Sequence, residues 1–439
     1  MVRINVPIFE DKLIRLTKNI KKTVQNTLVY AKQQDEKDPL RSYRERFYLP
    51  IQKNGKPYVY LCGNSLGLQP KSTAKYLNQE LEDWKNLGVE GHFHAKNPWM
   101  PYHEFLTEKM AKVVGAKPIE VVVMNTLSVN LHLLMASFYR PTTERYKILI
   151  ESDAFPSDKY AVESQLKFHG YDDGLLELKA REGEVLVRHE DIETMIEKEG
   201  ENIALVLIGC PNYYTGQVFN MKRITELAHA KGCKVGFDLA HGAGNLNLQL
   251  HDSGVDFATW CTYKYLNSGP GSIGGCFVHE RHANDFDLPR FAGWWGHNKE
   301  TRFGMRDDFD PIPGAEGWQL SNPPILSLAA IMASLDMFDE VGMDKLNEKT
   351  LKLTGYLEFL VNDLNNDEIE IITPSNTAER GCQLSIQVKN ADKTLFDAIT
   401  KDGVIADWRE PDVIRVAPVP MYNSFEDVWN FVDILKRNL

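Results

Sequence analysis

Several features that would place this chain in another class of protein are missing from its 439 residues. It has no run of about eighteen apolar residues that could span a membrane, and charged residues soon follow Met1 where a leader would be apolar. Basic residues are in deficit, and the net charge of -11 argues against nucleic acid or an anionic membrane as a partner. We therefore expect a soluble, cytoplasmic protein.

Cysteine is scarce and scattered. The six cysteines form no Cys-x-x-Cys pair, which argues against a zinc knuckle and a disulfide framework, and no metal site is expected. Most are expected to be small core residues in a reducing compartment. The chain is instead rich in core-forming residues, with 43% hydrophobic side chains over a length that suits two or three domains.

The middle of the chain alternates strand-like and helix-like segments. Continuous β-branched runs, in place of alternating ones, predict strands buried on both faces and therefore an α/β fold with a mainly parallel sheet between helices. Strands are expected at residues 146–151, 203–208, 234–238, 257–260 and 273–278, and helices at 158–168 and 221–231.

A domain boundary is predicted where turn-forming residues cluster, at 310–317 and 321–324, before a helical stretch at 325–341. The predicted division is an N-terminal helical segment (1–55) that packs on the core, a large α/β domain (56–315) and a smaller α+β domain (316–439). Within the last, helices are expected at 343–364, 393–401 and from 424, with strands at 383–388 and 413–416.

The most informative residues are Asp238, at the end of a predicted strand, and Lys264, after the next one. A glycine-rich segment, Asn267-Ser-Gly-Pro-Gly-Ser-Ile-Gly-Gly275, follows, and its backbone could approach a phosphate closely. Alone, such an aspartate is more often a cap and such a lysine a solvated surface residue. Together they are the arrangement that holds pyridoxal 5'-phosphate (PLP), with the lysine as Schiff base and the aspartate keeping the pyridine nitrogen protonated.

Further candidates are expected at the same sheet edge. His241 could orient Asp238 or contact the cofactor, or it could be a core histidine. Leu127 and Ser128 begin a predicted helix whose N terminus could bind phosphate, although an ordinary N-cap serine fits equally well. Phe155 could stack on a flat ring, with Asp158 reaching that ring or capping the next helix.

Three segments point to a substrate. Tyr213-Tyr214 places phenols at the sheet edge, where one could act as general acid or base, a weak signal because half-buried tyrosines are common. The segments 91–99 and 293–297 are too rich in aromatic residues for exposed loops unless they cover something. Arg415 interrupts an otherwise buried strand, so it needs a partner, and a substrate carboxylate and a structural salt bridge are equally good readings.

Eight ordered motifs resemble those of the kynureninases, PLP-dependent enzymes of the aspartate aminotransferase fold type (fold type I). The motifs run from about residue 60 to the C terminus: Gly63-Asn-Ser-Leu-Gly67, Asn130-Leu-His-Leu-Leu-Met135, Phe155-Pro-Ser-Asp158, Gly236-Phe-Asp-Leu-Ala-His241, Tyr263-Lys-Tyr-Leu-Asn267, Gly293-Trp-Trp-Gly-His297, Ser321-Asn-Pro-Pro324 and Arg415-Val-Ala-Pro-Val-Pro420. The resemblance implies a large domain with a mainly parallel, seven-stranded type of sheet and a smaller C-terminal α+β domain.

The resemblance also implies a role for each matching residue. Lys264, Asp238 and Tyr214 would be catalytic, with Tyr214 moving a proton at the substrate carbonyl. The implied cofactor contacts are Leu127, Ser128, Phe155, Pro156, Ser157, Asp158, Asp238, His241, Tyr263, Lys264, Trp294 and Asn322. The implied substrate contacts are Arg415, His92, Asn322 and Ser65. Trp294 and Asn322 match positions that reach the cofactor from a neighbouring subunit, which implies a homodimer with shared active sites.

The implied reaction is hydrolysis of the Cβ–Cγ bond of L-kynurenine, and of 3-hydroxy-L-kynurenine, to the anthranilate and L-alanine, in tryptophan catabolism and NAD biosynthesis. The chain departs from its relatives at Gly209-Cys210, where a serine contacts the cofactor. The nearest alternative is a cysteine desulfurase or selenocysteine lyase. Those enzymes usually have histidine where this chain has Tyr263, and no cysteine is expected in a loop near Arg415. A cofactor-free binding protein is disfavoured by Asp238, His241 and Lys264.

Overall fold

The central element of the fold is a seven-stranded sheet in the order β2-β8-β7-β6-β5-β3-β4. The computed structural model describes residues 24–439, so the first 23 residues of the predicted N-terminal segment lie outside it. β4, β3, β5, β6 and β7 are parallel to one another, whereas β8 is antiparallel to both β7 and β2. This confirms the mainly parallel sheet. The strands are β2 (Val121–Val123), β3 (Lys147–Glu151), β4 (Leu175–Leu178), β5 (Ile203–Gly209), β6 (Lys234–Asp238), β7 (Phe257–Trp260) and β8 (Gly275–Val278).

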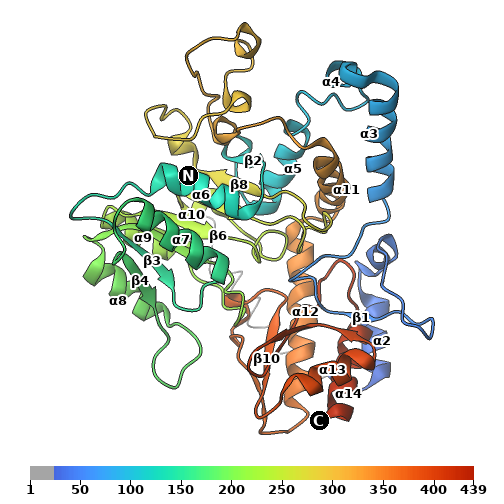
Figure 1. The fold of residues 1–439 in the computed structure, drawn as a ribbon. Helices are drawn as coiled ribbons and strands as arrows, with labels where there is room; N and C mark the ends of the chain where they lie inside the picture. Colours follow the sequence, from blue (N-terminus) through green and yellow to red (C-terminus); the bar gives the residue numbers. More distant parts are fainter. Residues whose placement is uncertain (1–23) are drawn as a thin grey trace, which may run out of the picture.

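Helices cover both faces of this sheet because neighbouring strand residues point to opposite sides. Ile148 and Leu205 pack with α6 and α7, whereas Leu149 and Val206 pack with α5, α8, α9 and α11. The result is the predicted three-layer α/β arrangement (Figure 1). The helices of this part are α3 (Thr73–Leu87), α4 (Gly91–His94), α5 (Glu104–Val114), α6 (Leu127–Phe138), α7 (Pro156–Phe168), α8 (His189–Glu199), α9 (Met221–Ala230), α10 (Leu250–Ser253) and α11 (Ile325–Val341).

Two of the elements start two residues away from their predicted positions, and both shifts have a local cause. β8 begins at Gly275 instead of 273, because the Ile273 amide donates to Ser327 Oγ (3.2 Å) and so leaves the strand ladder. α7 begins at Pro156, two residues before the predicted start. Proline suits the first helical position, where its fixed φ matches the helix and its missing N–H is not needed.

The C-terminal part builds a second, antiparallel sheet in the order β12-β13-β10-β9. Its helices pack on one hydrophobic cluster that also contains Ala31, Val59 and Leu61 from the start of the described chain. Figure 1 shows α2 beside α14 accordingly. The elements are α2 (Leu28–Lys37), β1 (Val59–Tyr60), α12 (Met343–Asn362), β9 (Ile369–Ile371), β10 (Leu384–Val388), α13 (Lys393–Lys401), β11 (Val404–Ile405), β12 (Asp407–Arg409), β13 (Val413–Val416) and α14 (Phe425–Asn438).

Short 3-10 helices connect these elements, and three of them matter below. They are η3 (Pro118–Glu120), η4 (Glu280–His282) and η5 (Trp294–Gly296). α11, which the predicted division assigns to the small domain, packs against α3 and α5 of the large one. The division at residues 56 and 316 stays a prediction. Between residues 24 and 439, no helix combines the length and the apolar character needed to cross a membrane.

A buried ion pair ties the N-terminal segment to the C-terminal part. Asp38, the residue after α2, binds Lys349 of α12 at 2.6 Å, and both side chains are about nine-tenths buried or more, with 5% and 6% of their surface exposed. An exposed pair, Lys32 with Glu426 at 3.7 Å, spans the same interface. Only the Asp38–Lys349 pair is shielded from water, so each of its two charges needs the other to compensate for the loss of hydration.

We predict that Asp38→Ala lowers the free energy of unfolding by about 3–5 kcal/mol, because it leaves the Lys349 ammonium buried without a partner. Lys32→Ala is the matched control and should cost less than about 0.5 kcal/mol, since its pair is exposed to water. Urea unfolding of the two variants and the parent measures both values. Equal losses in the two variants would contradict the assignment.

Candidate active site

A pocket lies at the carboxyl ends of three neighbouring parallel strands. Glu151 ends β3, Gly209 ends β5 and Asp238 ends β6, and Lys264 enters from the loop after β7. The pocket contains about 550 Å³ of empty space, a volume that includes the part open to solvent. Its lining residues are Leu127, Ser128, Glu151, Phe155, Ser157, Asp158, Gly209, Pro211, Tyr213, Asp238, Ala240, His241, Cys261, Tyr263 and Lys264.

Two helices begin at one end of this pocket. Ser128 in the first turn of α6 and Ser157 in the first turn of α7 lie with their hydroxyl oxygens 3.1 Å apart. The N-cap of α6, Thr126, makes no side-chain capping hydrogen bond, and neither does Phe155, the N-cap of α7. The N–H groups of Leu127, Ser128 and Ser157 donate to no group among the described residues and remain available to an anion, and the helix dipoles favour negative charge there.

Lys264 is surrounded by aromatic side chains at the other end. Its Nζ lies 5.9 Å from the ring centroid of Phe155 and 5.9 Å from that of Tyr263. Phe155 meets Tyr213 edge to face, with centroids 5.3 Å apart. Behind the lysine, the Gly67 amide donates to the Tyr263 carbonyl at 2.9 Å. The backbone beside Lys264 is thus fixed by a hydrogen bond, while the lysine side chain lines the pocket, a space that Phe155 and Tyr263 also line.

Three buried carboxyl groups face this space. Burial raises the pKa of Asp238, although the Ala240 amide donates to it at 2.6 Å and Lys264 opposes the rise. Burial also raises the pKa of Asp158, and the neighbouring Asp238 raises it further. The Oδ1 atom of Asp158 is buried without a hydrogen-bond partner among residues 24–439. The group therefore lacks a donor that a ligand could supply.

Glu151 is the third carboxyl group, and sequence reasoning missed it. Burial raises its pKa from 4.5 to about 7, although the Gly209 amide donates to it. A Cβ atom on Gly209 would lie 2.7 Å from Glu151 Oε1, so the glycine leaves room for this carboxyl group. Its position at the end of a strand could have indicated it, because β3, which ends at Glu151, and β6, which ends at Asp238, are both neighbours of β5.

His241 lies close to the same groups. Burial lowers its pKa well below the usual value, and the nearby charges of Lys264, Arg415 and Arg409 lower it further, so the imidazole is neutral. Its carbonyl oxygen accepts from Asn245 Nδ2 at 2.8 Å, which fixes the turn after β6. A neutral ring can accept or donate a hydrogen bond at the pocket wall.

The loop at Tyr213–Thr215 is held by side chains of the C-terminal sheet. Three successive carbonyl groups each accept a hydrogen bond: Tyr213 from Arg415 Nη1 (2.5 Å) and Gln383 Nε2 (3.0 Å), Tyr214 from Ser385 Oγ (2.5 Å) and Thr215 from Thr373 Oγ1 (2.6 Å). Tyr213 lines the pocket, whereas Tyr214, the predicted proton-transfer residue, is absent from the lining. Burial raises the pKa of Tyr214, with Asp412 adding to the effect.

Arg415 is almost completely buried, with 1% of its surface exposed, and forms an ion pair with Asp407 on the neighbouring strand. Its Nε atom has no hydrogen-bond partner in the part of the chain that the structure describes. The structural salt bridge, one of the two readings of this arginine, is therefore present, and one donor remains free. Arg409, which sequence reasoning missed, shares Asp407 at 3.2 Å and lies 5.8 Å from the Tyr213 ring centroid.

Seven of the predicted residues do not line this pocket within one chain: Ser65, His92, Pro156, Tyr214, Trp294, Asn322 and Arg415. Ser65 and Asn322 are exposed, and Trp294 is 41% exposed. His92 packs edge to face on Trp99, at 5.4 Å. Trp99 also lines a second, apolar groove between α3 and the start of α11, together with Glu80, Trp84, Pro324, Ile325, Leu326 and Ser327.

The cysteines argue against thiolate chemistry. All six are free, and five are buried, as expected for core residues. The expectation that none lies near Arg415 is wrong, because Cys62 pairs with Ala417 across a parallel bridge. Burial nevertheless raises the pKa of Cys62 to about 12, so it is a protonated thiol at neutral pH and a poor nucleophile.

These residues fit PLP. The two helix N termini match its phosphate, the unpartnered Asp158 oxygen and the buried Asp238 match a protonated ring nitrogen, and Lys264 matches its aldehyde. The fold and the pocket define a PLP-dependent enzyme of fold type I. A family model described as "Kynureninase C-terminal domain" matches residues 346–435.

Relatives along the whole chain give the family. The kynureninase of Myxococcus xanthus is 59% identical over 93% of this chain and 96% of its own length. The kynureninase of Flavobacterium psychrophilum is 57% identical over 94% of this chain and 99% of its own length. The chain belongs to the kynureninase family, and it is a PLP-dependent hydrolase that acts on carbon–carbon bonds.

Similar solved structures support the fold alone. The cysteine desulfurase CsdA of Escherichia coli matches with a TM-score of 0.74 at 15% identity, over 91% of this chain and 98% of its own. A C-DES mutant with glycine covalently linked to its PLP cofactor matches with a TM-score of 0.74 at 14% identity. This match covers 86% of this chain and 96% of the C-DES chain. The desulfurase alternative is thus a distant structural relationship, whereas the relatives with high identity are kynureninases.

Gly67 provides a test of how the lysine is positioned. A Cβ atom at this residue would lie 2.3 Å from the Lys264 carbonyl oxygen and 2.4 Å from Asn267 Oδ1. Gly67→Ala should therefore displace Lys264 and weaken PLP binding by about tenfold or more. Titration of the cofactor-free protein with PLP measures this by absorbance. Gly355→Ala in α12, where a Cβ atom meets nothing within 4 Å, is the control and should bind as the parent does.

Glu151 gives a pH-dependent prediction. Its pKa in the cofactor-free fold is about 7, above the usual 4.5, so its contribution to stability is complete below pH 4.5 and is lost as the pH rises through 7. Glu151→Gln cannot ionise, so it should be more stable than the parent at pH 8, by up to about 3 kcal/mol, and lose this advantage near pH 5. Urea unfolding of both proteins at pH 8 and at pH 5 measures this difference in the free energy of unfolding. The exposed Glu163→Gln should show no such trend.

Proposed function

We propose that this chain hydrolyses the Cβ–Cγ bond of L-kynurenine, and of 3-hydroxy-L-kynurenine, to release the anthranilate and L-alanine. The observation that carries this proposal is the meeting of Asp238, Lys264 and two helix N termini in one pocket, whose wall residue Tyr213 is bound through its carbonyl by the buried Arg415. The chain's similarity to kynureninases over nearly its full length supports the substrate class. We also propose a cytoplasmic location, which the free cysteines and the acidic charge support.

Each pocket residue has a proposed task. When bound, PLP supplies an electron-withdrawing ring next to the substrate α-carbon. Leu127, Ser128 and Ser157 bind its phosphate at the helix N termini, with Pro156 setting the first turn of α7. Phe155 and His241 pack against the ring, and Asp238, supported by Asp158, holds a proton on the ring nitrogen. Tyr263 positions Lys264.

Lys264 and a tyrosine are the proposed proton carriers. Lys264 holds the cofactor at rest, and its freed amine takes the proton from the substrate α-carbon. A phenol then moves a proton at the γ-carbonyl oxygen while water attacks this carbon. Tyr214 is our sequence-based candidate, and the adjacent Tyr213 is the phenol that lines the pocket, so the pair Tyr213–Tyr214 supplies the group.

Arg415 is the proposed carboxylate receptor. Its Nε atom is buried and unpartnered in the described part of the chain, while Asp407 and the Tyr213 carbonyl hold the other side of the guanidinium group. A planar guanidinium that is fixed on one side can offer its remaining donors to a substrate carboxylate. Ser65 lies in the loop that contacts the Lys264 backbone, and we propose that it supports substrate binding.

We propose a homodimer in which each pocket is completed by the partner subunit. His92, Trp294 and Asn322 lie outside the Lys264 pocket of their own chain, so a second chain is the natural source of Trp294 and Asn322. Apolar side chains near these segments are exposed in the single chain: Trp84 (62%), Val89 (73%), Phe93 (59%) and Trp294 (41%). Large exposed apolar side chains that lie close together favour a covered interface.

Mixed dimers test the lysine and the shared site together. We expect Lys264→Ala to be inactive and Trp294→Ala to be severely impaired. If the site is shared, mixing the two variants creates dimers with one intact pocket, and random pairing should restore about one quarter of the parent's turnover. Release of fluorescent anthranilate from L-kynurenine measures this.

The outcomes separate the parts of the proposal. Turnover by Lys264→Ala alone would refute the role of the lysine. Full activity of Trp294→Ala, or no recovery on mixing, would refute the shared site and leave the reaction intact. A mixture of Lys264→Ala with Asp238→Ala is the matched control, because both residues belong to the same pocket. It should stay inactive.

A further inference from the structure

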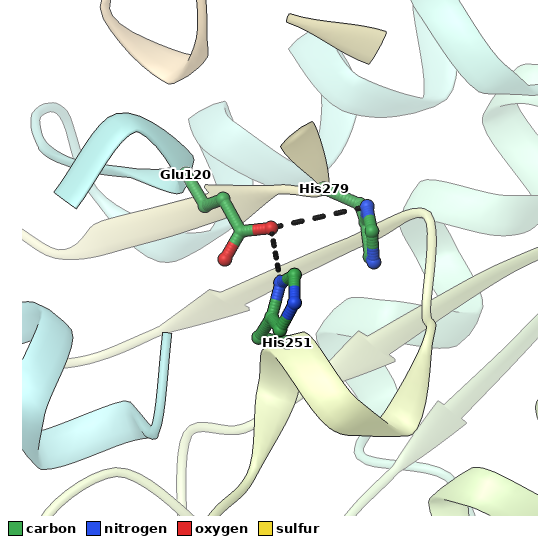
Figure 2. A group of neighbouring side chains, drawn as sticks. All are labelled: Glu120, His251 and His279. Atoms are coloured by element: carbon green, nitrogen blue, oxygen red, sulfur yellow. Dashed lines mark hydrogen bonds and ion pairs between the residues drawn. The ribbon is translucent and has the colours of Figure 1, made fainter. Parts of the chain in front are cut away.

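A second cluster of reactive side chains lies away from the PLP pocket. Glu120, His251 and His279 bring one carboxylate and two imidazoles together, with ligand atoms all within 4.8 Å of one another (Figure 2). Glu120 ends η3 just before β2, and His279 follows the end of β8. Because β8 is antiparallel to β7, this cluster lies at the edge of the sheet opposite Asp238. The proposed reaction does not use it.

We propose that Glu120, His251 and His279 bind a divalent transition-metal ion, for which zinc is the best match. One carboxylate and two imidazoles are a ligand set that zinc accepts, and three segments of the chain supply them. The site would join η3, α10 and the end of β8 at one point.

The distances support this proposal. In a tetrahedral zinc site with bonds of about 2.0–2.2 Å, neighbouring ligand atoms lie about 3.3 Å apart. Glu120 Oε1 lies 2.8 Å from His251 Nδ1 and 3.8 Å from His279 Nδ1, so the two distances bracket that value. Figure 2 shows both rings turned toward the same carboxylate oxygen. Small rotations of the histidine rings would therefore complete the geometry.

Neither a lysine nor an arginine among the described residues forms an ion pair with Glu120. Its side chain is completely buried and is fixed by amides, with Lys117 N donating to Oε2 (2.8 Å) and Glu280 N to Oε1 (2.9 Å). Among the described residues, only His251 and His279 form ion pairs with it, because the nearby Lys117 ammonium binds Glu280 instead. A buried carboxylate without a fixed positive partner favours a bound cation.

Metal binding would exchange existing contacts for metal bonds. His251 Nδ1 would give up the proton that it shares with Glu120, and His279 Nδ1 would give up its 3.1 Å hydrogen bond from the Arg281 amide. Arg281 is exposed, so water can replace that bond. Water would take the fourth position. Since a proton is released, zinc affinity should fall as the pH is lowered.

Zinc titration of the metal-stripped holoenzyme against a chromophoric chelator tests the site. We expect one tightly bound zinc per chain, and at least about tenfold weaker binding in His251→Gln and in His279→Gln. His189→Gln, which changes a histidine of α8 outside the cluster, is the control and should bind as the parent does. No binding by the parent, or unchanged binding in both cluster variants, would overturn the proposal.

Thermal unfolding gives a second measurement that is independent of turnover. Zinc should raise the melting temperature of the parent and of His189→Gln, and leave that of the two cluster variants unchanged, because the ion stabilises only a fold that binds it. Both cluster variants should keep their kynurenine turnover, since the site is remote from Lys264. A zinc-induced rise of equal size in the cluster variants would place the ion elsewhere and refute the site.

Discussion

The main physical constraint on the pocket is that three buried carboxyl groups share it with one amine. Charges that are removed from water need partners, and Asp238, Asp158 and Glu151 outnumber the single ammonium group of Lys264. Burial raises the pKa of each acid, and neighbouring carboxyl groups raise the pKa values of Glu151 and Asp158 further. A positively charged ring nitrogen in this space relieves the same imbalance, so the cofactor completes the charge pattern of the pocket as well as its chemistry.

A second constraint is that the loop at residues 213–215 connects the seven-stranded sheet to the C-terminal sheet. The carbonyl groups of residues 213–215 face the C-terminal sheet, which supplies a donor to each of them. Arg415 takes part in this contact through the Tyr213 carbonyl, so the proposed carboxylate receptor also joins the C-terminal sheet to a residue of the pocket wall. A movement of the C-terminal sheet would therefore move Tyr213, and with it the wall of the pocket that faces Phe155.

The sequence was informative wherever function leaves a local pattern. Lys264 and Asp238 could be found because strand ends and glycine-rich turns are visible in the order of residues, and the sheet could be predicted from its β-branched runs. The partner of Arg415 could not, because Asp407 faces it through the register of two antiparallel strands. Glu151 was missed because its importance comes from burial, and Tyr213 lines the pocket where Tyr214 was expected because side-chain direction in a loop depends on its contacts. The antiparallel β8 also depends on tertiary pairing.

The packing of Ala31, Val59 and Leu61 into the C-terminal cluster has a consequence for the order of folding during synthesis. These residues leave the ribosome first, yet their partners in α12 and α14 follow roughly 300 residues later, after about 15–60 s at ordinary rates of translation. The large sheet can form in the meantime, while the early segment waits with its apolar side chains uncovered. A chaperone that binds nascent chains would find its natural target there, and a truncated chain that lacks α14 would leave the same surface open permanently.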